Sequence, residues 1–401
     1  MRILLSHNSF PSQFRRLCQY WLDQGHDVRF LASRQEWHAP NIESLPLLSY
    51  TPRKFYPSAY THPYLHRLEK AVLEGQSALR RCIQLKESGW YPDVVISHVG
   101  FGNGLFLRQC FPEALRIGLV EWFYNSTGSD VDFLTGGEPP SINHCARLQI
   151  WNSEVLLELS TLDKVVVPTH WQKAQFPSLF RDQLTVIHEG IDYQNLSRLS
   201  QFPPPSLPCL PDDDDLKVIT YVSRCFETYR GFPQFIRVIE RIQRLRSNVH
   251  VLIVGQDGSA YSPPRSDGMP WSTWATDNFD LDPLRTHWLG SLQTQQYIDV
   301  LRRSDVHFYL SIPFILSWSL LEAMSVGCAI VSSSTPPVLE VLENNKSGLL
   351  NDFFDIEAHV TSVLTLLDDS RLARSLSKEA QSAASFYCST HGFRAWDSLL
   401  S

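Results

Sequence analysis

The feature that most constrains the fold is a β-α-β pattern between residues 304 and 332. Apolar runs at 306–310 and 328–332 predict two buried strands, and the segment 319–326 between them predicts a helix that ends at Gly327. Strands joined through a helix lie parallel, so this unit predicts an α/β fold with a parallel sheet.

Two interpretations of the start of this helix stay open. The first N–H groups of a helix lack partners and its dipole is positive there, so the loop with Ser317 and Ser319 suits an anion. Glu322, one turn further on, is placed to accept hydrogen bonds from hydroxyl groups. The alternative is an ordinary core unit in which Glu322 is solvated.

The same alternation continues through the chain, which with 401 residues is too long for one core. A proline- and aspartate-rich segment predicts a linker at residues 201–215, where a solvated charge run is favoured over a metal site. We expect a first domain at 1–200, a second at 216–384, and an amphipathic tail at 385–401 that packs back on the first. The segments predicted as loops or insertions are 50–64, 125–143 and 259–284, and a single helix is predicted over 145–159.

Composition excludes several classes of protein. The net charge of −7 argues against general binding to nucleic acid or to a strongly anionic membrane and leaves a local basic patch open. The eight cysteines show no paired metal-binding spacing and indicate a reducing compartment. No signal peptide or membrane span is predicted, so we expect a cytoplasmic protein, with peripheral contact at the inner membrane face left open.

Polar residues follow the predicted strands of the first half, at the edge where open α/β sheets bind ligands. His98 is followed by glycines that allow close backbone approach and is a stronger candidate than most single histidines. For the polar residues after the first strand, ligand contact and simple helix capping are equally open. The candidates in this half are His7, Asn8, Ser9, His98, Glu121 and Glu189.

In the second half, Arg224 and Arg230 follow one predicted strand. Two guanidinium groups that converge there would bind a diphosphate, and Gly231 favours this over two surface arginines. The chain lacks the G-x-G-x-x-G and P-loop motifs, which argues against a dinucleotide-dependent redox enzyme and against P-loop chemistry.

Six segments together resemble the retaining family-four (group 1) glycosyltransferases of the GT-B fold, in a bacterial branch. They are FPSQFRRL (10–17), HVGFGNGLFL (98–107), PTHWQKAQFP (168–177), VIHEGID (186–192), SRCFETYRGFPQF (223–235) and PFILSWSLLEAM (313–324). The resemblance implies two Rossmann-like domains that face each other across a cleft, and a nucleotide-sugar donor held mainly by the second.

The resemblance also implies roles for residues. Arg224 and Arg230 would bind the donor diphosphate, Glu322 the ribose hydroxyls, and His98 the transferred sugar. His7, Asn8, Ser9, Glu121 and Glu189 would lie near the sugar or the acceptor. No metal and no cofactor are implied. Further donor contacts would come from Gly255, Gly290, Ser291, Leu292, Ser317, Ser319 and the backbone of Leu320 and Leu321.

The chain departs from the family pattern at two positions. Phe314 stands where the family's E-x7-E motif has its first glutamate, which normally contacts the donor sugar, and Asn103 stands where an acidic residue is expected. The predicted function is retaining transfer of a sugar from a UDP- or GDP-type donor to an acceptor hydroxyl, in polysaccharide, glycolipid or glycoconjugate synthesis. The alternatives are a nucleotide-sugar epimerase or hydrolase of the same fold and a non-catalytic sugar-nucleotide-binding protein.

Overall fold

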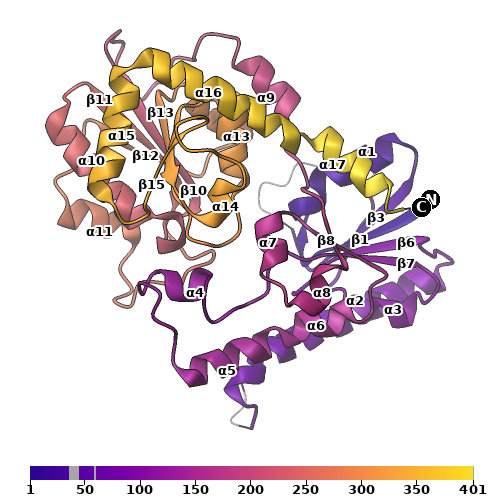
Figure 1. Ribbon diagram of the computed structural model, residues 1–401. Helices are drawn as coiled ribbons and strands as arrows, with labels where there is room; N and C mark the ends of the chain where they lie inside the picture. The colour runs from indigo at the N-terminus through magenta and orange to yellow at the C-terminus, as the bar shows by residue number, and fades with distance from the viewer. Residues whose placement is uncertain (36–44, 58–59, 401) are drawn as a thin grey trace. The chain divides into compact units, whose positions relative to one another are not determined.

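A computed structural model describes residues 1–35, 45–57 and 60–400 (Figure 1). The chain forms two compact units, one of Met1–Gly190 with Ser389–Ser401 and the other of Ile191–Cys388. The proline- and aspartate-rich segment 201–215 belongs to the second unit. Residues 58 and 59 of the predicted loop 50–64 lie outside the described residues.

The first unit is built on a parallel sheet with strand order β5-β3-β1-β6-β7-β8-β9. Alternate residues of β1 face opposite layers: Ile3 and Leu5 pack in the core that contains Trp21, whereas Leu4 packs in the core that contains Leu85. The strands are β1 Arg2–Ser6, β2 Ser9–Phe10, β3 Asp27–Ala32, β4 Arg34–Gln35, β5 Leu47–Ser49, β6 Val94–His98, β7 Leu115–Leu119, β8 Lys164–Val167 and β9 Leu184–Val186. The helices are η1 Ser12–Phe14, α1 Arg15–Asp23, η2 Pro63–Leu65, α2 His66–Glu87, α3 Leu107–Cys110, α4 Asp130–Phe133, α5 Ile142–Trp151, α6 Ser153–Leu159, α7 His170–Ala174, α8 Ser178–Arg181 and α17 Ser389–Asp397.

Two predictions for this unit were wrong in detail. The segment 125–143 is not only loop, because a capping box of Ser129 and Asp132 starts the short helix α4. The single helix expected over 145–159 is two helices, α5 and α6, which meet at Asn152. The Asn152 side chain bonds the backbone N–H and carbonyl of Tyr124, each at 2.9 Å, so the junction is fixed to a neighbouring loop.

The second unit has a parallel sheet with strand order β12-β11-β10-β13-β14-β15. Phe308 of β13 contacts Phe235 of α10 and His359 of α15, whereas the next residue, Tyr309, packs in the cluster with α13. Helices therefore cover both faces of this sheet (Figure 1). The strands are β10 Lys217–Cys225, β11 Val249–Gln256, β12 Thr286–Gly290, β13 Val306–Tyr309, β14 Ile330–Ser333 and β15 Leu349–Asn351. The helices are α9 Tyr193–Leu199, η3 Thr228–Arg230, α10 Phe232–Leu245, α11 Trp271–Asn278, α12 Thr294–Arg302, α13 Trp318–Val326, α14 Pro336–Leu339, α15 Ile356–Asp368, α16 Ser370–Ala384 and η4 Ser385–Tyr387.

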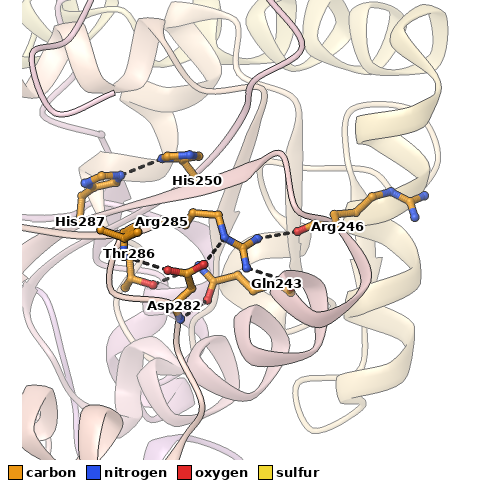
Figure 2. Close-up of polar contacts among 8 residues, drawn as sticks. Gln243, Arg246, His250, Asp282, Arg285, Thr286 and His287 are labelled. Atoms are coloured by element: carbon orange, nitrogen blue, oxygen red, sulfur yellow. Dashed lines mark hydrogen bonds and ion pairs between the residues drawn. The ribbon is translucent and has the colours of Figure 1, made fainter. Parts of the chain in front are cut away.

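The segment 259–284, predicted as an insertion outside the core, contains helix α11. Ala275 of this helix is fully buried, and the Trp271 ring packs edge-on against Phe232 with centroids 6.2 Å apart. The segment ends in a polar cluster around Arg285 (Figure 2). There Arg285 donates to the carbonyl of Arg246 at 2.6 Å and pairs with Asp282, so it satisfies a backbone acceptor at the end of α10.

Helix α17 at the end of the chain packs on α1 of the first unit. The Trp396 side chain is 1% exposed and meets Trp21 edge-on. The Asp397 carboxylate accepts a hydrogen bond from Trp21 Nε1 at 2.8 Å and another from the Tyr20 hydroxyl. Within the described residues, no helix combines the length and the apolar character needed to cross a bilayer.

Replacing Asp397 with alanine is expected to lower the free energy of unfolding by about 1–3 kcal/mol, because Trp21 Nε1 then lacks its acceptor. Urea denaturation of the full chain measures the loss. The matched control is Asp23→Ala, an exposed aspartate on α1, for which we expect a change within about 0.5 kcal/mol. Equal stabilities of the two variants would show that these bonds do not hold α17.

Candidate functional site

Arg230 is fixed at the carboxyl end of the second sheet. Gly231, which follows it, has φ of +62° and lies so close to Leu310 that an added Cβ would come within 2.5 Å of the Leu310 Cβ. The Arg230 side chain is buried, and its Nη1 donates to Tyr309 Oη at 3.2 Å and Ser311 Oγ at 2.9 Å. The other three guanidinium N–H groups, on Nε and Nη2, make no hydrogen bond within the described residues and can serve a ligand.

The Tyr309 hydroxyl joins Arg230 to the start of α13. It accepts a hydrogen bond from the Ser317 N–H at 3.1 Å, and Ser317 Oγ caps the helix by accepting from the Ser319 N–H at 3.3 Å. The Leu320 N–H already donates to the Ser317 carbonyl at 3.2 Å, while the side chains of Leu320 and Leu321 are fully buried. A guanidinium and a positive helix end are thus held in one hydrogen-bonded network.

Glu322 is held by its neighbour on α12. Its Oε2 accepts a hydrogen bond from the Tyr297 hydroxyl at 2.8 Å. Burial, together with the charge of Glu322, raises the pKa of Tyr297 well above its usual value, so the phenol stays a hydrogen-bond donor. The carboxylate is oriented one turn into the helix, as the sequence predicts.

The other donor-contact candidates gather at the same edge of the sheet. Arg224 is exposed at the end of β10. An added Cβ on Gly255 would lie 2.3 Å from the Ser223 carbonyl oxygen, so the neighbouring backbone requires glycine there. Gly290 ends β12, and Leu292 follows and packs on a core cluster. Between them, Ser291 Oγ donates to Gln256 Oε1 at 3.2 Å.

Phe314 is buried in an aromatic cluster. Its ring meets Tyr229 and Tyr261 edge-on, each with centroids 5.3 Å apart, and the Tyr261 ring lies 5.4 Å from the Arg230 guanidinium carbon. The position at which the family pattern has a carboxylate is therefore filled by an apolar contact that continues to Arg230.

Glu227 positions Tyr261. The carboxylate is 1% exposed, and its Oε2 accepts backbone N–H bonds from Ala260, Tyr261 and Ser262 at 3.3, 3.0 and 3.0 Å. Sequence reasoning missed Glu227, Tyr261 and Tyr309. The sequence offers one signal for Glu227, which is an acidic residue between Arg224 and Arg230, the two arginines assigned to the donor site.

In the first unit, His7, His98 and Glu121 come together. His98 is buried at the end of β6, its Nε2 lies 3.1 Å from Glu121 Oε2, and its ring stacks on Phe101. The centroids of His7 and His98 are 4.7 Å apart. Gln13 Nε2 also lies 3.5 Å from His98 Nε2.

Two buried ring nitrogens in this group, His7 Nε2 and His98 Nδ1, have no hydrogen-bond partner among the described residues. The Ser9 N–H donates to His7 Nδ1 at 2.8 Å, so the neutral ring carries its proton on Nε2. Burial, and then the proximity of His98 and Arg34, keeps the pKa of His7 well below its usual value. The pair is suited to polar ligand atoms such as sugar hydroxyls.

The remaining first-unit candidates have other partners. The carbonyl of Asn8 accepts from Ser33 Oγ at 3.0 Å, and Glu189 Oε2 lies 3.9 Å from His188 Nε2. Asn103 is fully buried and donates to Ser6 Oγ at 3.0 Å. Asn103 thus ties the glycine-rich turn to β1. The described residues hold no group of three or more His, Cys, Asp and Glu side chains suited to a metal ion.

Each half of the chain matches a protein-family model. Residues 24–196 match the model described as glycosyl transferase family 4 group, and residues 210–383 match the model described as glycosyl transferases group 1. The chain is a family-four glycosyltransferase. Membership implies a retaining transferase that uses a nucleotide-sugar donor.

Solved glycosyltransferase structures share the fold of this family-four enzyme at low sequence identity. A glycosyltransferase from Rickettsia africae is 14% identical with a TM-score of 0.65, and covers 100% of this chain and 97% of its own. Sucrose-phosphate synthase from Thermosynechococcus elongatus is 16% identical with a TM-score of 0.68, covering 100% and 98%. HepE from Anabaena, solved with UDP and glucose, is 15% identical with a TM-score of 0.67, covering 100% and 99%. These neighbours show the GT-B fold. No curated protein matches the sequence.

Proposed function

We propose that this glycosyltransferase binds a UDP- or GDP-type sugar through the second unit and transfers the sugar to an acceptor hydroxyl in glycan or glycolipid synthesis. The observation that carries the proposal is Arg230, whose buried guanidinium is oriented by Tyr309 and Ser311 and keeps three N–H donors for a ligand. Bidentate, charge-assisted bonds to phosphate oxygens require such a fixed fork.

The proposed mechanism follows from where charge develops. As the bond between the sugar C1 and the diphosphate oxygen breaks, negative charge collects on the leaving phosphate. Arg230, Arg224 and the N-terminus of α13 stabilise that charge, and Glu322 holds the ribose hydroxyls. The sugar passes through an oxocarbenium-like state, and the acceptor hydroxyl attacks from the side of the leaving group, which retains the anomeric configuration. We assign contact with the transferred sugar to His98.

A thermal-shift screen of the full chain against UDP, GDP, ADP and their sugars tests the donor. A nucleotide at about 100 times its Kd is expected to stabilise the protein by about 2.7 kcal/mol, which gives a clear rise in Tm. The matched control is the corresponding nucleoside without phosphates, which should give little shift because it lacks the groups that Arg230 binds. No shift with any nucleoside diphosphate would contradict the proposed donor site.

A second assay separates transfer from the two alternative functions. Incubation with the donor alone should give slow hydrolysis and no epimer, because the acceptor hydroxyl is the proposed nucleophile. Rapid hydrolysis or epimerisation without an acceptor would instead favour the enzyme alternatives. Tight donor binding without turnover across a broad panel of acceptors would favour a binding protein.

A further inference from the structure

Two adjacent pockets in the first unit carry an excess of positive charge. The first has a volume of about 400 Å³ and the second about 660 Å³, and both are lined by Arg67 and Lys70 of α2. The first pocket is also lined by Arg34 and Arg53 and by two carboxylates, Glu74 and Glu154. Four cations therefore face two carboxylates in a protein whose net charge is −7.

The two carboxylates are already held by protein donors. Glu74 Oε1 accepts hydrogen bonds from the hydroxyls of Ser33 at 2.6 Å and Tyr50 at 2.7 Å. Glu154 is buried and forms an ion pair with Arg67 Nε. Burial raises the pKa of Glu154, and the charge of Arg67 opposes this effect.

The other cations of the first pocket have no such partner. Arg34, Arg53 and Lys70 are exposed, and none of them forms an ion pair within residues 1–35, 45–57 and 60–400. Their charges are thus available to a ligand that enters the pocket. Lys70 Nζ lies over the Phe55 ring, 5.2 Å from its centroid, so a cation–π contact holds the ammonium at the pocket without neutralising its charge.

Aromatic side chains accompany the cations in both pockets. Phe55 and Phe101 line the first, and Trp151 and Tyr64 line the second. Apolar faces with a few placed polar groups are typical of sites for small organic ligands. Phe101 also stacks on His98 at 4.9 Å, so the first pocket borders the His7–His98 group described above.

We propose that these pockets bind an acceptor saccharide that carries an anionic group, such as a phosphate, with Arg34, Arg53 and Lys70 holding the anion. The identification of the ligand as an acceptor rests on the proposed function, whereas the binding of an anionic sugar does not. The concave shape favours a saccharide over a flat membrane surface.

Isothermal titration of the full chain with glucose 6-phosphate and with glucose tests the proposal. We expect the phosphorylated sugar to bind at least about tenfold more tightly, a difference of about 1.4 kcal/mol, because charge-assisted bonds form only with the anion. The double variant Arg53→Gln/Lys70→Gln should lose about tenfold in affinity for glucose 6-phosphate and little for glucose. Both substituted side chains are exposed, so the fold should be unaffected.

The matched control is Arg80→Gln with Lys86→Gln, which removes the same charge from α2 outside both pockets. Arg80 lies ten residues after Lys70, about 15 Å along the helix. The control should bind glucose 6-phosphate as the wild type does. Equal affinity for the two sugars, or equal losses in the two double variants, would overturn the proposal, as would binding of anionic phospholipid vesicles without binding of the phosphorylated sugar.

Titration of the same variants with UDP and GDP keeps this inference separate from the proposed donor. The pocket substitutions should leave nucleotide affinity unchanged. Binding of glucose 6-phosphate without any nucleotide binding would uphold the anionic site and reject the donor proposal. Nucleotide binding with no preference for the phosphorylated sugar would uphold the donor proposal and reject the anionic site.

Discussion

Replacing Arg230 with alanine is expected to lower kcat for sugar transfer by about 10²-fold or more. The guanidinium is oriented by Tyr309 and Ser311, and its remaining donors are proposed to meet the charge that develops on the leaving diphosphate. Removing one fixed donor to a developing oxyanion costs about 10²–10³ in kcat in other enzymes. Steady-state turnover of the donor and acceptor measures the effect, and Arg224→Ala is expected to act in the same direction.

The control for Arg230→Ala is Arg374→Ala, an exposed arginine on α16 in the same unit. It should turn over at the wild-type rate. Because Arg230 is buried, each variant also needs a melting curve and a nucleotide titration, which distinguish a lost catalytic contact from a misfolded unit. Near-wild-type kcat in folded Arg224→Ala and Arg230→Ala would reject the diphosphate assignment.

The β13-α13-β14 unit was predictable because its signals are local. Apolar runs mark the strands, and Gly327 ends the helix with φ of +91°, a conformation that other residues rarely adopt. The Ser317 side chain caps the helix by accepting a hydrogen bond from the N–H of Ser319, only two residues further along the chain. Neighbouring residues determine these features, so a single sequence carries them.

The contact between Glu227 and Tyr261 could not be predicted in this way. The two residues are 34 positions apart, and the carboxylate binds backbone N–H groups, which have no signature in side-chain type. The role of Tyr309 was hidden for a related reason, since an apolar strand predicts a buried ring but not where its hydroxyl lies. Nothing in the sequence distinguishes Arg224 from Arg230, although the Arg224 side chain is exposed and the Arg230 side chain is buried.

The first of the two pockets in the first unit could not be predicted from the sequence either. Arg34, Arg53 and Lys70 lie on three separate segments, and no run of basic residues marks them in a chain of net negative charge. Arg34 follows β3 and Arg53 follows β5, and the parallel pairing of these two strands brings the segments after them to one edge, whereas Lys70 lies on α2. Sequence patterns therefore predict the edge of a sheet at which ligands bind more readily than the charge of the pocket there.

His307 is expected to make the second unit labile to acid. The side chain is fully buried on β13, and its Nδ1 lies 2.8 Å from Thr220 Oγ1 on the neighbouring strand β10. Burial lowers the pKa of His307 to about 3. The unfolded chain takes up a proton at this histidine below a pH of about 6.5, whereas the folded chain does not until a pH of about 3. Unfolding is therefore accompanied by proton uptake across this window, and stability falls as the pH falls.

The measurement is the free energy of unfolding of the second unit by urea at pH 4, 5 and 6. One such histidine contributes a slope of up to about 1.4 kcal/mol per pH unit. His307→Asn keeps an amide group at the position of Nδ1 but cannot titrate, so its slope should be smaller than that of the wild type by about this amount. Other buried groups titrate in the same window, but they contribute equally to both proteins and cancel in the difference. Equal slopes for the wild type and His307→Asn would show that His307 does not make the unit acid-labile.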